Sequence, residues 1–179
     1  MSRIGKKPIE IPAGVTVELN DLTITVSGPK GKLVREVNRN VFVSIEGNIV
    51  NVTRKSEDKN IKALHGLYRS LISNMIVGVS QGFTKKLNVK GVGFRLTKAG
   101  NKLTLNIGFS HPCEMTIPEG MDVDLEGNTA IIVKGICKEK VGSFAADIKA
   151  LRPVEPYHHY GIHYDGEKLI KKQGKTGKR

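Results

Sequence analysis

The stretch VFVSIEGNIVNV (Val41–Val52) and the stretch MDVDLEGNTAIIV (Met121–Val133) align at an offset of 80 residues. Both alternate apolar and polar residues on each side of a Gly-Asn pair. This alternation is typical of two antiparallel strands joined by a tight turn. Each stretch therefore predicts a β-hairpin, and together they predict a structural unit that the chain uses twice.

The residues after each hairpin repeat at the same offset and predict a helix. The matched apolar positions are Ile61, Leu64, Tyr68 and Leu71 in the first copy, and Val141, Phe144, Ile148 and Leu151 in the second. Spacings of three and four residues place such side chains on one helical face. Because a single helix can close only one face of a sheet, each copy is predicted to be an α+β domain with its helix late in the sequence.

Further alternating runs predict additional strands at 15–19, 22–26, 32–37, 84–89, 94–97, 102–107 and 114–117. We place the domain boundary near Gly82. The expected architecture is two tandem, duplicated α+β domains, each an antiparallel sheet with one late amphipathic helix, followed by a basic C-terminal tail. The corresponding ranges are 1–81 for the N-terminal domain, 82–152 for the C-terminal domain and 153–179 for an extended Pro/Tyr/His segment with the tail.

The charge of the chain favours a polyanionic partner. Its formal net charge is +12, and residues 152–179 contribute seven cations against three anions. After Glu167 the sequence contains no acidic residue. Such a balance favours nucleic acid over a membrane, because no basic segment has the large apolar face of an interfacial helix.

Several other classes of protein are not indicated. No run is long and apolar enough for a membrane-spanning helix, and the start of the chain lacks the apolar stretch of a secretory signal. Cys113 and Cys137, the only cysteines, form no CxxC pair and are expected to be reduced thiols of a cytosolic chain. The segment around Gly174 and Lys175 imitates a P-loop, but Leu169 stands where that loop needs glycine.

The glycine-rich stretch KGVGFRL, residues 90–96, has two interpretations. It partly matches the strand of RNA-recognition motifs, in which aromatic rings stack on bases. The third position of that signature is Val92 instead of an aromatic residue, and aromatic residues make up only 5% of the chain. A glycine bulge within a strand is therefore the favoured interpretation.

The histidines His158, His159 and His163 also have two interpretations, a metal site or a solvated, RNA-facing loop. Asp165 is the only carboxylate at a suitable interval, so the loop is favoured and no metal or other cofactor is expected. No motif brings together a nucleophile, a base and an orienting group, so no enzymatic activity is expected.

Residues 152–164, RPVEPYHHYGIHY, are predicted to be extended because prolines 153 and 156 exclude a helix. This segment could lie along an RNA backbone, with its tyrosines available for stacking or for hydroxyl contacts to phosphate. A solvated linker to the tail is the other interpretation.

Five landmarks in order resemble a known family: SRIGKKPIEIPAGV at residue 2, SGPKGKL at 27, VKGVGFRL at 89, IGFSHP at 107 and RPVEPYHHYGIHYDGE at 152. Together they span nearly the whole chain and are similar to the bacterial form of the universal family of the sixth large-subunit ribosomal protein. The resemblance implies two similarly folded α+β domains that bind large-subunit (23S-type) rRNA near the sarcin-ricin loop, where translational GTPases dock. One departure is that the family commonly has Lys-Gly-Lys where this chain has His158-His159-Tyr160.

The residues expected to bind RNA lie in the glycine-rich stretch and its preceding strand, in the Pro/Tyr/His segment and in the tail. They are Lys85, Lys86, Lys90, Gly91, Gly93, Arg95, Arg152, Tyr157, His158, His159, Tyr160, Lys168, Lys171, Lys172, Lys175, Lys178 and Arg179.

The sequence thus predicts a ribosome-bound, cytoplasmic structural protein that works by placement. Its expected partners are large-subunit rRNA, neighbouring large-subunit proteins and, indirectly, translational GTPases, with no membrane partner. Two alternatives stay open: a free RNA-binding module or RNA chaperone outside the ribosome, and a metal-dependent hydrolase that uses the histidine group.

Overall fold

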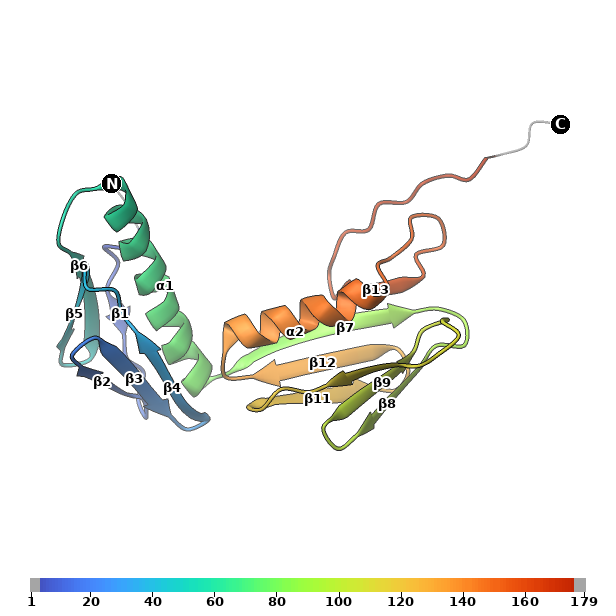
Figure 1. Cartoon of the computed structure of the whole chain (residues 1–179), viewed down its shortest axis with the longest axis horizontal. Helices are drawn as coiled ribbons and strands as arrows, with labels where there is room; N and C mark the ends of the chain where they lie inside the picture. Colours follow the sequence, from blue (N-terminus) through green and yellow to red (C-terminus); the bar gives the residue numbers. More distant parts are fainter. Residues whose placement is uncertain (1–3, 176–179) are drawn as a thin grey trace. The chain divides into compact units, whose positions relative to one another are not determined.

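The computed structural model describes residues 4–175, whose fold divides into two units (Figure 1). Unit 1 comprises Met1–Phe83 with Ile136–Lys138, and unit 2 comprises Thr84–Gly135 with Glu139–Arg179. Within residues 4–175, neither helix combines the length and apolar character needed to cross a membrane.

Unit 1 contains two three-stranded sheets and one helix. The first sheet has the order β1-β6-β5 and the second the order β2-β3-β4, with antiparallel pairing throughout. The elements are β1 (Ile9–Glu10), β2 (Thr16–Asn20), β3 (Thr23–Gly28), β4 (Gly31–Glu36), β5 (Val41–Glu46), β6 (Ile49–Arg54) and α1 (Lys59–Ser80).

Helix α1 contacts strands of both sheets and so closes the core of unit 1 (Figure 1). The predicted apolar face is confirmed only in part, because Leu64 and Tyr68 pack against the core while remaining half-buried. The buried apolar side chains lie further along the helix, among them Ile72, Ile76 and Val79. The core-facing side of α1 therefore continues toward its C-terminal end, beyond the residues that the repeat identified.

Unit 2 repeats the arrangement with more strands. A four-stranded sheet has the order β11-β12-β7-β13, and a three-stranded sheet has the order β10-β9-β8. The elements are β7 (Phe83–Lys90), β8 (Arg95–Ala99), β9 (Lys102–Asn106), β10 (Cys113–Thr116), β11 (Met121–Glu126), β12 (Ala130–Gly135), α2 (Lys138–Leu151) and β13 (Gly161–Tyr164).

Helix α2 runs along β7 and β12 (Figure 1), and the face predicted from the repeat is the buried one. Val141, Phe144 and Ile148 are all at most 5% exposed. The helix ends at Leu151 because Pro153 disfavours helical backbone in the residue before it and offers no amide hydrogen.

Both predicted Gly-Asn hairpins are present. Strands β5 and β6 pair from Glu46↔Ile49 onward, and β11 and β12 pair from Glu126↔Ala130 onward. Gly47 and Gly127 lead the two turns with φ values of 58° and 59°, a left-handed conformation that glycine adopts at little cost. The fold class is α+β with a duplicated unit, as predicted, although each unit divides its strands between two sheets where the sequence indicated one.

Candidate nucleic-acid interface

Three segments that are far apart in the sequence meet around the guanidinium group of Arg152. Its Nη1 donates a hydrogen bond of 2.6 Å to the carbonyl of Ile107. Its Cζ lies 5.4 Å from the ring centroid of Phe94 and 5.4 Å from that of Phe109, within the range of cation-π attraction. We call this group, Arg152 with Ile107, Phe94 and Phe109, the Arg152 clamp.

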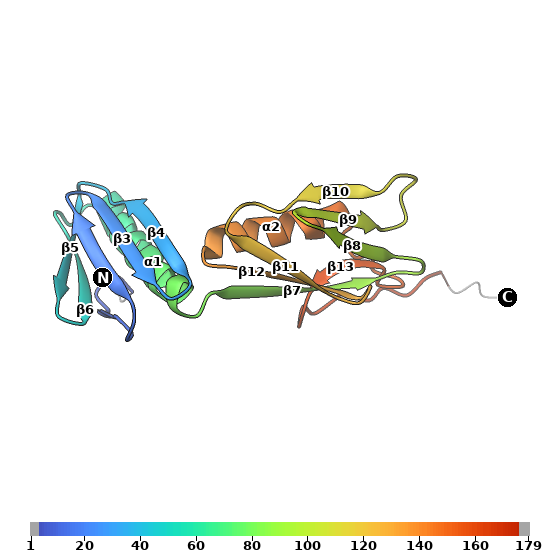
Figure 2. The ribbon, with the colours of Figure 1, turned by 90° about the horizontal axis from the view of Figure 1, so that it is seen from below.

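The clamp fixes the turn after β7 and the loop after β9, which lie at one end of unit 2 (Figure 2). Between Ile107 and Phe109, Gly108 has a φ of 83°, and a Cβ there would stand 3.0 Å from Nη1 of Arg152. Arg152 is itself half-buried. The prediction that Arg152 contacts RNA stays a prediction, whereas its contacts in the structure are those of a residue that positions loops.

The glycine-rich stretch forms a turn, which corrects the expectation of a bulge within a strand. Residues 91–94 join β7 of one sheet to β8 of the other. Gly93 has a φ of 74°, and a Cβ on Gly91 would lie 2.3 Å from the ring of Phe94. Both glycines are therefore needed for the chain to reverse beside the ring. Phe94 is half-buried, and the guanidinium group of Arg152 lies over its ring.

The rim of the clamp is exposed and basic. Val92 at the tip of the turn is 84% exposed, and Phe109 is 48% exposed. Lys90 and Arg95 flank the turn with exposed side chains, and among the ion pairs of residues 4–175 neither has an acidic partner. These two cations are free to meet an anion from another molecule.

Lys85 and Lys86, also predicted to bind RNA, are differently placed. Nζ of Lys86 lies 2.6 Å from Oε2 of Glu126, and this hydrogen bond raises the pKa of Lys86. Nζ of Lys85 lies over the ring of Tyr164 at 5.6 Å from its centroid. Lys86 thus has its charge balanced inside unit 2, whereas Lys85 remains exposed with no carboxylate partner among the ion pairs of the described residues.

The pairing of Lys86 belongs to a row of ion pairs along β11. Asp122 contacts Lys98 at 2.7 Å, and Asp124 contacts Lys134 at 2.6 Å. With Glu126, these acids occupy alternate positions of the strand. Side chains at alternate positions share one face of a sheet, so the acids of β11 gather their lysines on one surface.

The predicted extended segment returns to the sheet as a strand. Strand β13 pairs antiparallel with β7, with Ile162 opposite Val89, and Pro153 forms a parallel bridge with Ile162. The amide of Ile162 donates to the carbonyl of Arg152 at 2.9 Å. The residues between these points, 154–160, therefore close into a loop beside the end of α2.

Glu155 organises this loop. Its Oε1 accepts hydrogen bonds from the backbone amide of His158 at 2.6 Å and from Nδ1 of His158 at 3.1 Å. The hydrogen bond from the backbone amide of His158 is the main cause of the lowered pKa of Glu155. The ring of His158 also stacks on that of Tyr160, with centroids 5.6 Å apart and an interplanar angle of 17°. The imidazole plane is thus held from two sides.

The tail crosses the same loop and forms a groove with it, which we call the tail groove. The amide of Lys172 donates to the carbonyl of Pro156 at 3.0 Å. The tail groove has a volume of about 550 Å³. The residues that line it, and so define it, are Tyr157, His158, Lys171, Lys172, Gln173 and Gly174.

The remaining tail positions were predicted as a group of cations. Lys168, Lys171, Lys172 and Lys175 are exposed, and none has an acidic partner among the described residues. Lys178 and Arg179 lie outside the described residues.

The loop histidines do not assemble a metal site, since residues 4–175 contain no group of three or more side chains suited to hold one. His159 and His163 each keep one buried ring nitrogen without a hydrogen-bond partner in the described part of the chain.

The sequence did not indicate a role for Phe109, and it did not predict the contacts of Lys149 with Glu167 and Tyr164. Nζ of Lys149 lies 2.6 Å from Glu167 and 4.8 Å from the ring centroid of Tyr164. This contact ties α2 to the start of the tail and lowers the pKa of Glu167. The only signal for Phe109 was its place in the landmark IGFSHP.

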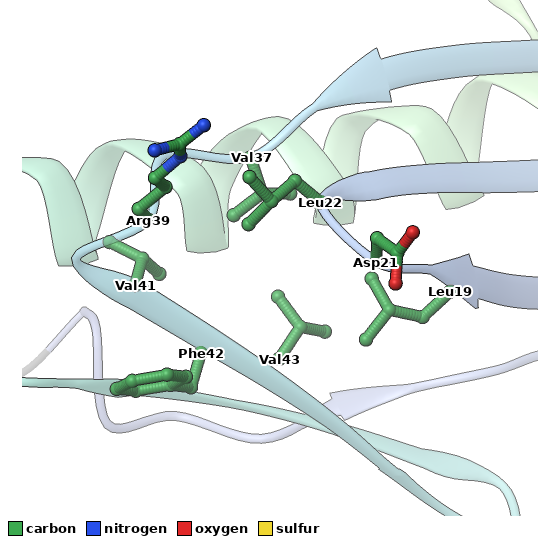
Figure 3. Close-up of a pocket in the computed structure, with 8 residues that line it drawn as sticks. All are labelled: Leu19, Asp21, Leu22, Val37, Arg39, Val41, Phe42 and Val43. Atoms are coloured by element: carbon green, nitrogen blue, oxygen red, sulfur yellow. The ribbon is translucent and has the colours of Figure 1, made fainter.

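A second hollow lies in unit 1 between the β2–β3 hairpin and β5 (Figure 3). Its volume is about 100 Å³, below the roughly 300–1,000 Å³ of small-molecule sites. Its lining is Leu19, Asp21, Leu22, Val37, Arg39, Val41, Phe42 and Val43. Asp21 and Arg39 stand apart on opposite sides of apolar side chains (Figure 3), so the hollow assembles no reactive group.

The fold and the interface define a class: a duplicated, two-unit α+β protein with a basic, loop-built surface on its second unit. A family model for ribosomal protein L6 matches residues 11–82 and 90–165, one match to each repeat. The chain therefore belongs to the ribosomal protein L6 family, which confirms the resemblance found in the sequence.

Individual relatives agree over the full length. The chain is 56% identical to the large ribosomal subunit protein uL6 of Listeria monocytogenes over 178 residues, covering 99% of this chain and 100% of the relative. It is 52% identical to the same protein of Exiguobacterium sibiricum and 49% identical to that of Shouchella clausii, with the same coverage. Membership of this family of ribosomal proteins confirms the prediction that the chain is not an enzyme.

Proposed function

We propose that the protein is a structural component of the large ribosomal subunit that binds 23S-type rRNA through unit 2. The observation that carries the rRNA contact is the separation of charge within this unit. The acids of β11 balance Lys86, Lys98 and Lys134 on one face of the sheet. The cations of the β7–β8 turn and of the tail keep no acidic partner among the described residues.

The proposed mechanism is placement. Free cations displace counterions from RNA phosphates, and each phosphate neutralised adds roughly 0.7–0.9 to the slope of log K against log salt. The Arg152 clamp and the bond from Lys172 to Pro156 hold the loop, the turn and the tail in a fixed arrangement. A preformed surface loses less conformational entropy on binding, so it holds the RNA more tightly.

The position on the ribosome is a finer proposal, and it rests on the family resemblance. We place the protein in the region near the sarcin-ricin loop, beside neighbouring large-subunit proteins, where it supports the docking of translational GTPases. The protein would then be ribosome-bound in the cytoplasm.

Quantitative mass spectrometry across a sucrose gradient of the native lysate tests the assignment to the ribosome. We expect the protein to peak with large-subunit proteins in a one-to-one ratio and to remain after a moderate salt wash. Crosslinking within those fractions then tests the location, with crosslinks expected in and around the sarcin-ricin helix. A protein that stays at the top of the gradient would be a free RNA-binding module instead.

Charge-matched variants test the contact surface. Lys171, Lys172 and Lys175 replaced together by alanine should lower the salt slope for an rRNA fragment by about 2–3. The control variant replaces three lysines that have acidic partners, so it removes the same amount of charge from a different surface. These are Lys98, Lys102 and Lys134. This control should leave the slope nearly unchanged. Equal effects of the two triple variants would show that net charge, and not the proposed surface, controls binding.

A further inference from the structure

We propose that the tail groove binds one unpaired nucleotide of the RNA, with the base against the rings of Tyr157 and His158 and the two phosphates that flank it at Lys171 and Lys172. This inference rests on the proposed rRNA binding and adds the kind of RNA that the groove accepts. It assigns a stacking subsite to the tail side of unit 2, whereas at the rim that carries Lys90 and Arg95 the guanidinium group of Arg152 already lies over the rings of Phe94 and Phe109.

The groove is built before RNA arrives. The backbone bond from Lys172 to Pro156, 3.0 Å long, fastens the tail to the loop. The loop is closed in turn by the bond of 3.0 Å from the amide of Glu155 to the carbonyl of Tyr160. The volume of about 550 Å³ lies within the roughly 300–1,000 Å³ range of sites that hold small molecules. A single nucleotide is a ligand of that class.

The aromatic side of the groove offers open ring surface. Tyr157 is 49% exposed, and the side chain of His158 is 72% exposed. One face of the His158 ring is covered by Tyr160 and its Nδ1 edge faces Glu155, so the exposed area is that of the other face. Because these contacts fix the ring, it meets a base with little loss of rotational freedom.

The opposite side supplies charge without competition. Lys171 and Lys172 are exposed, and no acidic side chain lines the groove within the described part of the chain. Glu155, a carboxylate of the same loop, accepts hydrogen bonds from the amide and the ring of His158. Phosphates that enter the groove therefore meet Lys171 and Lys172, with no acidic side chain in the lining of the groove.

The combination of rings and cations selects unpaired RNA. In a paired RNA helix the base faces are covered by their neighbours, and proteins contact the minor groove and the backbone. An unpaired nucleotide exposes its base face, and stacking on an aromatic ring is favourable whatever the base. Lysines alone would bind duplex and single-stranded RNA alike. The rings therefore predict a preference for single-stranded RNA, which charge by itself does not predict.

The test uses the full-length protein with two RNA probes of equal phosphate number, a short single strand and a blunt-ended duplex. Tyr157→Leu should weaken binding of the single strand by about 5- to 100-fold and change binding of the duplex less than about twofold. The matched control is Phe42→Leu, which removes an aromatic ring of unit 1 that is 52% exposed. This variant should change neither affinity.

A spectroscopic signature separates stacking from a merely structural role. The chain has four tyrosines and no tryptophan, so a base stacked on Tyr157 should quench part of the tyrosine emission. Tyr157→Phe should keep the affinity for the single strand and lose that quenching. Lys171→Ala with Lys172→Ala should lower the salt slope for the single strand by about 1.4.

If Tyr157→Leu weakens both probes equally, or neither, the stacking subsite is refuted while binding of the unaltered protein to an rRNA fragment still supports the proposed function. If the unaltered protein binds no large-subunit rRNA, the proposed function itself fails.

Discussion

Replacing Arg152 by alanine should destabilise unit 2 and leave the salt dependence of RNA binding unchanged. The substitution removes a hydrogen bond from a charged donor to the carbonyl of Ile107, 2.6 Å long, for which about 1.5–3 kcal/mol is typical. It also removes two cation-π contacts at 5.4 Å, each of which contributes about 0.5–1 kcal/mol when partly exposed. We expect a loss of about 2.5–5 kcal/mol in the free energy of unfolding.

Urea unfolding followed by tyrosine fluorescence measures this loss, since three of the four tyrosines, at positions 157, 160 and 164, lie in unit 2. With an m value of about 1–2 kcal/mol/M for a unit of this size, the midpoint should fall by more than about 1 M. Arg152→Lys should lose nearly as much, because an ammonium group lacks the planar surface that lies between two rings.

Salt titrations of RNA affinity separate the two roles of Arg152. A residue that only positions loops leaves the slope intact when it is removed, although the affinity falls. Lys90→Ala is the matched control, because Lys90 is exposed and carries no ion pair among residues 4–175. It should lower the slope by about 0.7–0.9 and change stability by less than about 0.5 kcal/mol. An Arg152→Ala protein with unchanged stability and a lower slope would refute the positioning role and support direct contact with phosphate.

Three further predictions concern single positions. Gly91→Ala brings a methyl group to 2.3 Å from the ring of Phe94, so the ring must move; RNA affinity should fall with no change of salt slope in the same titration. Arg54, by its hydrogen bond, lowers the pKa of Glu57 from 4.5 to about 2, so this pairing stabilises unit 1 fully above about pH 4.5 and less as the pH falls toward 2. Glu57→Gln should therefore flatten the pH dependence of the urea midpoint over that window, and an unchanged dependence would contradict the assignment. Gly28→Ala places a Cβ 2.9 Å from a backbone oxygen of α1 and should cost about 1–3 kcal/mol in thermal unfolding; a neutral effect would mean that the helix shifts freely.

Local pattern was sufficient to predict the repeat, the hairpins and the helices. The Gly-Asn turns and the spacing of three and four residues between apolar positions are local patterns. Each depends only on residues a few positions apart, so each can be read from a short stretch of sequence. The same holds for the end of α2, which Pro153 determines directly. The tandem α+β architecture followed from these elements, because a single late helix can cover only part of the strands.

Contacts across long sequence distances were not predictable. Arg152 meets a carbonyl 45 residues away, and Lys86 meets a carboxylate 40 residues away. Nothing in the sequence near Lys86 distinguishes it from Lys90, yet one is paired and the other has no acidic partner among the described residues. Likewise, the return of β13 to β7 depends on where the whole sheet leaves an open edge. Sequence alone therefore does not tell which cations have an acidic partner in the fold.

The duplication shows how one unit acquired the loop surface and the other did not. At the offset of 80 residues, Arg152 corresponds to Ile72 and Pro153 corresponds to Ser73. Helix α1 continues through both positions to Ser80 and buries Ile72 in the core of unit 1, at 1% exposure. Helix α2 instead ends at Leu151, since the proline excludes the next turn.

The early end of α2 changes what the next residue can do. Outside the helix, the side chain of Arg152 reaches the loop after β9, and its carbonyl receives the amide of Ile162 at 2.9 Å to start the return toward β13. That return builds the loop on which the tail rests. An isoleucine at this position could supply neither the hydrogen bond to Ile107 nor the positive charge near the rings of Phe94 and Phe109. The substitution of an Arg-Pro pair for an Ile-Ser pair therefore accounts for the loop-built surface of unit 2, and the Ile-Ser pair of unit 1 explains why that unit keeps a longer helix and a closed core at the equivalent place.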